Sequence, residues 1–153
     1  MSDQDARSGD VTVLNILIAT LIDSIEGYEK SAGDVQNPRF AELFNSRAQE
    51  RRGAVDALRA AVRAGGGDPE DDGSVLGSAH RVFLSLKEAV TGRDDKAIVN
   101  EIERGEDYLK GKFKAALEKT ELGPDARTAV QSAWDSVRAG HDEMSALKHS
   151  LEV

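Results

Sequence analysis

Several glutamates and one histidine are expected at the same level of a helical bundle, because they lie at similar distances from the ends of their helices. They are the best candidates in this chain for binding a metal ion. Glu29 and His141 lie equally far from the expected starts of the first and last long helices. Carboxylate and imidazole ligands suit iron, manganese or zinc. The candidate metal ligands are Glu26, Glu29, Glu106 and His141, with Glu101 as a further acid at this level.

The same polar residues have a second interpretation that needs no metal. A buried charge is costly unless it is partnered, so polar groups that meet inside a bundle should bind one another. Arg47, and also Arg138, would then neutralise glutamates of the first helix, while His141 would hydrogen-bond a carboxylate. Ionisable clusters of this kind are often purely structural. We favour this interpretation, under which no cofactor is expected.

Apolar residues at spacings of three and four predict the helices that position these side chains. Asn37 and Pro38 form a helix start, with asparagine as the cap and proline in the first turn. Asp94 or Asp95 caps another helix, and Gly123 with Pro124 separates the last two. The expected long helices span about residues 12–33, 38–64, 95–120 and 124–151, after a loose tail at residues 1–10.

The lengths of the connections predict how these helices are arranged. Short turns join the first pair and the last pair, so each pair is an antiparallel hairpin. A shorter helix over residues 74–90 lies between the hairpins and, at about 1.5 Å per residue, is long enough to cross most of a bundle. We therefore predict an all-α four-helix bundle with a crossover helix, forming one domain over residues 11–153.

A glycine occurs inside each of the four long amphipathic stretches. These glycines are Gly27, Gly53, Gly105 and Gly140. Each costs about 1 kcal/mol of helix stability relative to alanine. Four such costs indicate close approach of helices, or space kept for a bulky or bound group.

Composition excludes several classes of function. The net charge is −8, and basic residues such as Arg47, Arg51 and Arg52 are spread among acids, which is typical of a solvated surface. A clustered basic surface for nucleic acid is therefore not expected. Cysteine is absent, which excludes thiolate metal sites and a cysteine nucleophile. We see neither a secretory signal nor an apolar run of the roughly 20 residues that span a membrane. We therefore expect a cytoplasmic protein.

The glycine triplet at residues 65–67 is not a phosphate-binding loop. No Gly-Lys-Ser/Thr sequence follows it, and the acids between Asp68 and Asp72 would repel phosphate. We read the triplet as the end of a helix that runs into an acidic turn. That turn could bind a basic protein partner, which is a third hypothesis for function.

Six segments of the chain match a known family: Leu14–Ile18, Ile25–Tyr28, Gly73–Arg81, Thr91–Asp95, Glu103–Asp107 and His141-Asp142. By these segments the chain resembles an uncharacterised bacterial family of four-helix bundles that is grouped with the ferritin-like proteins. The resemblance implies a ferritin-like fold and, more weakly, a role in stress adaptation.

Di-iron ferritin-like proteins supply a glutamate from two helices and Glu-x-x-His from the other two. By that resemblance, Glu26 or Glu29 matches the first glutamate, and Glu103 or Glu106 matches the second. His141 matches the last histidine, but Arg138 stands where its glutamate should be. The second helix has no histidine, because Gly53 follows Glu50 at that spacing. A two-metal, oxygen-activating site is therefore not expected.

These observations lead to one preferred function and one main alternative. We expect a non-catalytic, cytoplasmic, ferritin-like bundle that forms homo-oligomers and works through protein contacts, without nucleic acid or membrane. The alternative is a metal-binding or iron-handling protein with a degenerate carboxylate–histidine site in the bundle core.

Overall fold

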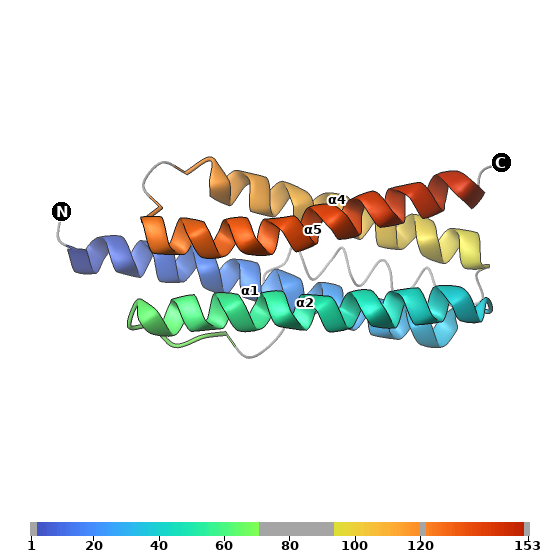
Figure 1. Ribbon diagram of the computed structural model, residues 1–153, viewed down its shortest axis with the longest axis horizontal. Helices are drawn as coiled ribbons and strands as arrows, with labels where there is room; N and C mark the ends of the chain where they lie inside the picture. Colours follow the sequence, from blue (N-terminus) through green and yellow to red (C-terminus); the bar gives the residue numbers. More distant parts are fainter. Residues whose placement is uncertain (1–2, 71–93, 120–121, 152–153) are drawn as a thin grey trace.

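The computed structural model describes residues 3–70, 94–119 and 122–151. No strand occurs in these residues, and four long helices pack lengthwise (Figure 1). The predicted all-α four-helix bundle is therefore confirmed, while the expected helix over residues 74–90 lies outside the described residues. The helices are α1 (Asp3–Asp34), α2 (Pro38–Ala64), α4 (Asp95–Leu117) and α5 (Pro124–Leu151).

Side-chain contacts at the two ends of the bundle establish the direction of each helix. At one end, both carboxylate oxygens of Asp10 in α1 accept from the Gly123 backbone N–H at 3.2 Å, just before α5 begins. At the other end, Asp95 at the start of α4 accepts from the backbone N–H groups of Gln36 and Asn37, at 2.8 and 2.9 Å. Helices α1 and α5 therefore run parallel, and α2 ends at the opposite end of the bundle from the start of α4 (Figure 1).

The predicted helix signals act as expected. The Asn37 side chain accepts from the Arg39 backbone N–H at 2.9 Å, with Pro38 in the first turn of α2. The Asp94 side chain accepts from the Ala97 N–H, also at 2.9 Å, and caps α4. Helix α2 ends at the glycine triplet, where Gly66 has a φ of 82°, a conformation that glycine adopts without strain.

Helix α1 begins at Asp3, earlier than the predicted start near Thr12. No proline or glycine occurs in residues 3–8, so the sequence there contains no helix breaker. The contact between Asp10 and Gly123 further fixes this part of the helix. That contact joins distant parts of the chain, so a reading of local sequence could not reveal it.

Helix α1 is also more apolar than expected. Its segment Gly9–Asp34 is long and apolar enough to cross a membrane, by length and composition alone. In the structure, however, 61% of its most apolar window is buried within the molecule. Core helices of bundles pass the same test. Leu14, Ile18 and Leu21 are at most 1% exposed, so packing against the other helices accounts for this apolar character.

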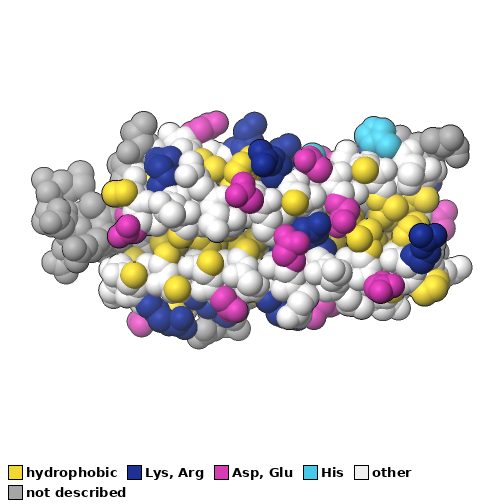
Figure 2. Space-filling model, viewed as in Figure 1, with side chains coloured by type: hydrophobic (Ala, Val, Ile, Leu, Met, Phe, Trp, Pro, Cys, Tyr) yellow, Lys and Arg dark blue, Asp and Glu magenta, His cyan; other side chains and the backbone are white. Residues whose placement is uncertain are grey.

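Each helix contributes apolar side chains to a single core. Ile18, Leu58, Leu109 and Val137, one from each helix, are all fully buried. Burying a side chain of this size contributes about 1.5–3 kcal/mol relative to leaving it in water. Figure 2 shows hydrophobic side chains along the seam between α2 and α5, with charged residues over the outer faces. These apolar side chains surround a group of buried polar side chains.

Candidate functional site

An ion pair between Arg51 of α2 and Glu106 of α4 lies at the centre of the bundle. Their side chains are 0% and 3% exposed. The guanidinium binds both carboxylate oxygens, Nη1 with Oε1 and Nη2 with Oε2, the second contact measuring 2.5 Å. Nη1 also donates to the Ser24 hydroxyl of α1 at 2.5 Å. A planar fork on a carboxylate is the strongest geometry available to such a pair.

Two further residues complete the walls around this pair. The Tyr28 ring lies 5.5 Å from the Arg51 guanidinium carbon, within the range of a cation–π contact. Gly140 of α5 faces the pair directly. A Cβ atom at Gly140 would lie 3.0 Å from Oε2 of Glu106 and would collide with Nη2 of Arg51. All four helices therefore contribute to the centre, and the guanidinium occupies the space that Gly140 leaves.

The predicted importance of helix glycines is confirmed at Gly140 but not at every position. Gly27 and Gly105 are also buried. Gly53 is exposed, and a Cβ atom there would meet nothing within 4 Å. Close packing inside the bundle therefore does not explain Gly53.

The charges at the centre stabilise one protonation state. Burial alone would lower the pKa of Arg51, but the Glu106 carboxylate more than compensates and raises this pKa above its ordinary value. Burial raises the pKa of Tyr28 well above its usual range, and the negative charge of Glu106 adds to the rise. The guanidinium therefore stays charged and the phenol stays neutral.

Replacing Tyr28 with phenylalanine is expected to reduce the loss of stability in alkali. Above about pH 10 the unfolded chain releases the phenol proton while the folded chain keeps it, so folding weakens as the pH rises. The Tyr28→Phe variant has no such phenol, so it should not show this fall in stability, which amounts to at most about 1.4 kcal/mol per pH unit. Near neutrality the two proteins should respond to pH alike, because the phenol is neutral in both the folded and the unfolded chain. Urea unfolding across this pH range tests the prediction, with Tyr108→Phe as the control. Equal slopes for wild type and Tyr28→Phe would contradict it.

A second ionic group lies beside the central pair. Arg47 is 9% exposed, and its guanidinium contacts Glu143 of α5 at 2.8 Å and Glu50 at 2.7 Å. The Ser136 hydroxyl donates to Glu50 at 2.7 Å. This group ties α2 to α5 and shields the central pair on that side.

The structure does not bring the four predicted metal ligands together. Glu106 lies at the centre, where it binds Arg51. Glu26 and Glu29 are exposed on the outer side of α1, because their neighbours Ile25 and Tyr28 take the inward positions. Glu29 pairs there with Arg52 of α2.

The fourth predicted ligand, His141, lies away from Glu106. Its side chain is 15% exposed, and Nε2 lies 2.5 Å from the carboxylate of Asp107 in α4. Gly140, one residue earlier, takes the central position on α5. His141 therefore lies at the edge of the interface between α4 and α5.

Two other residues expected at this polar level form surface pairs. Arg138 is 58% exposed and lies 3.9 Å from Asp135. Glu101 pairs with Arg104 at 2.6 Å, one turn along the same helix. Of the three residues predicted to support the polar centre, only Arg47 is adjacent to it.

Arg51 is the residue that sequence reasoning missed, since it was read as part of a solvated charged face. That prediction is wrong, although a signal was present. Arg51 stands in an apolar stripe of α2 at spacings of four and three: Phe44, Ala48, Arg51, Val55 and Leu58.

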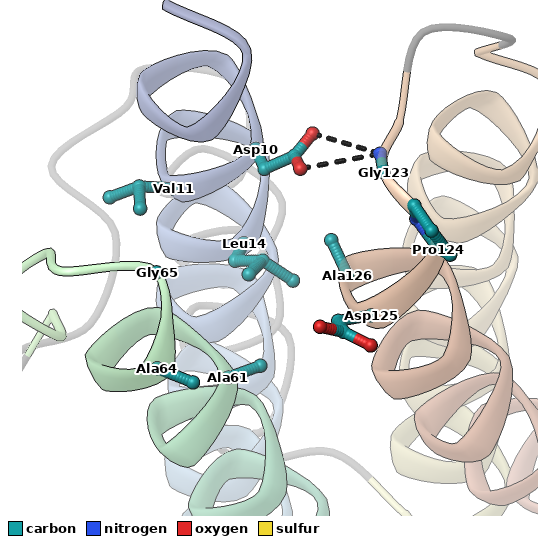
Figure 3. A pocket seen from close by; sticks show the side chains of 10 residues that line it. All are labelled: Asp10, Val11, Leu14, Ala61, Ala64, Gly65, Gly123, Pro124, Asp125 and Ala126. Carbon is teal, nitrogen blue, oxygen red and sulfur yellow. Dashed lines mark hydrogen bonds between the residues drawn. The ribbon is translucent and has the colours of Figure 1, made fainter. Parts of the chain in front are cut away.

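A cavity of about 490 Å³ opens at the end of the bundle where α1 and α5 begin (Figure 3). Most of its lining residues are small or apolar, and Asp10 is already bound to Gly123. Asp125 adds a second carboxylate. The ten lining residues include no hydroxyl, imidazole or amine side chain, so they do not form a nucleophile with a base.

Comparison with known proteins identifies the family. A family model described as "Domain of unknown function (DUF2383)" matches residues 10–119, well over half of the chain. The chain belongs to the DUF2383 family. The DUF2383 match includes Arg51 and Glu106 and ends before Gly140 and His141. No curated protein matches the chain.

Proposed function

We propose that this protein is a non-catalytic, ferritin-like bundle that acts in the cytoplasm through protein contacts, including contacts with copies of itself. One observation supports the proposal above the others: Arg51 binds both oxygens of the buried Glu106. In di-iron ferritin-like proteins, inward-facing glutamates bind metal at this level of the bundle. Here a guanidinium supplies the positive charge that a metal would otherwise supply.

The direction of the helices supports the ferritin-like part of the proposal. Ferritin-like bundles join two hairpins by one long crossover, so the first and last helices are parallel. The Asp10–Gly123 contact brings the N-terminal parts of α1 and α5 to the same end of the bundle, so these two helices are parallel. Helix α2 ends and α4 begins at opposite ends of the bundle, as such a crossover requires.

The surface beside Gly53 supports self-association. This exposed glycine lowers the helix stability of α2 without serving the core, yet it leaves space for a closely packed partner helix. A groove of about 310 Å³ lies nearby between α1 and α2. Its rim carries both signs of charge: Glu26 and Glu29 on α1, and Arg52, Asp56 and Arg59 on α2. A rim of mixed charge allows one copy to complement another.

The alternative functions have less support. A metal site in the bundle core would need Glu106, whose two oxygens already bind Arg51. A basic partner for the acidic turn would rest partly on residues 71–72, which lie outside the described residues. A role in stress adaptation rests on the family resemblance alone.

Sedimentation analysis and metal analysis of the purified protein test the proposal. We expect the wild-type protein to self-associate reversibly, and we expect Gly53→Glu to weaken that association while leaving the fold intact. Purification without added metal should give equal metal content in the wild type and in Glu106→Gln. A monomeric wild-type protein would contradict self-association. Stoichiometric metal that is lost in Glu106→Gln would instead support the metal-binding alternative.

A further inference from the structure

A second polar cluster lies away from the central ion pair, at the edge of the interface between α4 and α5. Glu103 and Asp107 are one turn apart on α4 and share a face, and His141 approaches them from α5. One ligand atom from each of these residues lies within 4.8 Å of the other two. The cluster contains His141, a predicted metal ligand, and Glu103, which the di-iron resemblance offered as an alternative to Glu106.

Two of the three side chains are largely buried, and the third is exposed to solvent. The Glu103 side chain is 12% exposed and that of His141 is 15% exposed, so the interface holds both. The Asp107 side chain is 58% exposed, which gives solvent access to the cluster. A bound ion would therefore keep positions for water, as in open metal sites.

The imidazole has a supporting carboxylate on its other side. Nδ1 of His141 lies 3.4 Å from the carboxylate of Asp142, while Nε2 faces Asp107 at 2.5 Å. Metal-binding histidines commonly donate one ring N–H to a carboxylate, which leaves the other nitrogen free to bind the ion. Without a metal, the shorter contact makes Nε2–H the donor to Asp107. A bound ion would take Nε2, and Nδ1–H would then donate to Asp142.

A lysine already supplies a positive charge to the cluster. Nζ of Lys148 contacts Glu103 at 3.1 Å, and Lys148 is 34% exposed. Its ammonium compensates the acids without filling a fixed coordination geometry. Because the stem of lysine is flexible, this group can move aside for a doubly charged ion.

We infer that Glu103, Asp107 and His141 form a binding site for a divalent transition-metal ion that links α4 to α5. Metal–ligand bonds of about 2.0–2.2 Å place neighbouring ligand atoms about 3–3.5 Å apart. The present spacing of up to 4.8 Å must therefore shorten by about 1–2 Å when an ion binds. One imidazole with two carboxylates suits zinc, manganese or ferrous iron better than calcium. The site is separate from the bundle centre and does not require Glu106.

Calorimetric titration of the full-length, metal-free protein with Zn²⁺ tests this inference. We expect one Zn²⁺ per chain, and His141→Ala should weaken binding at least about tenfold, as Asp107→Asn should. Asp142→Asn should weaken it by about tenfold through loss of ring orientation. Lys148→Met should strengthen it by removing the competing cation. His149→Ala is the matched control, because His149 is an exposed histidine on the same helix and lies outside the cluster.

A spectroscopic measurement separates this site from nonspecific binding to other surface acids. Co²⁺ bound at the cluster should give a visible absorption spectrum that His141→Ala abolishes and His149→Ala preserves. Circular dichroism of every variant should match the wild type, since the substituted residues are outside the apolar core. The inference is overturned if the wild type binds no Zn²⁺, or if His141→Ala and His149→Ala bind it equally well.

Discussion

Replacing Arg51 with methionine is expected to lower the free energy of unfolding by about 3–5 kcal/mol. Methionine fills much of the same volume, but it leaves Glu106 buried at 3% exposure without its cation. An unpaired carboxylate in such a site must either stay charged in an apolar medium or take up a proton. Both outcomes penalise folding near neutral pH. Urea unfolding of wild type and variant measures the loss.

Arg52→Met is the matched control for this substitution. Arg52 is the next residue on α2, but it is 44% exposed and pairs with Glu29 at the surface. Pairs of this kind contribute about 0–1 kcal/mol, so the control should remain close to wild type. Equal effects of the two substitutions would show that Arg51 has no special role.

The Arg51→Met variant should also respond to pH in a defined direction. Its folded form favours a proton on the isolated carboxylate more than its unfolded form does. The variant therefore gains stability relative to wild type as the pH falls from about 7 towards about 5, and loses it as the pH rises. A loss that stays constant over this range would contradict burial of an unpaired acid.

Replacing Gly140 with alanine is expected to destabilise the protein by about 1–3 kcal/mol, the usual effect of overpacking a core. The added methyl group would collide with Nη2 of Arg51 and would lie 3.2 Å from Cδ of Arg47. Both side chains are held by carboxylates and by three neighbouring helices, so neither can move without breaking ion pairs. This loss should exceed the gain of about 1 kcal/mol that alanine brings to a helix interior.

Gly111→Ala is the control for the effect of helix propensity alone. Gly111 lies inside α4, is exposed, and has no atom within 4 Å of an added Cβ. This substitution should stabilise the protein by up to about 1 kcal/mol. Thermal unfolding of both variants therefore gives shifts of opposite sign. A higher melting temperature for Gly140→Ala would rule out the close approach of Gly140 to the ion pair.

The helices and their order were predictable from the sequence because their signals are local. Asn37 caps α2, Asp94 caps α4, and the glycines after Ala64 end α2. Apolar spacing then identified most of the core. The start of α1 was not predictable in this way, because Asp10 holds Gly123 from the far end of the sequence.

The candidate site was harder to predict. The position of a residue along a helix gives its level in the bundle, but not whether its side chain points to the core or to solvent. Each residue turns the side chain by about 100°, since a turn contains about 3.6 residues. His141 and Glu29 were expected at the centre, whereas the adjacent Gly140 and Tyr28 are the residues that line it. Glu106, which was predicted as a metal ligand, lies at the centre and binds Arg51 there. Its partner Arg51 was missed because a charged residue within an apolar stripe was treated as surface.

A double-mutant cycle on Arg51 and Glu106 tests most directly whether these side chains form a paired unit at the bundle centre. We expect Arg51→Met and Glu106→Leu to be strongly destabilising separately, and the double variant to regain most of the loss. The coupling energy should be about 3 kcal/mol or more. Additive effects, with a coupling below about 0.5 kcal/mol, would contradict the buried pair.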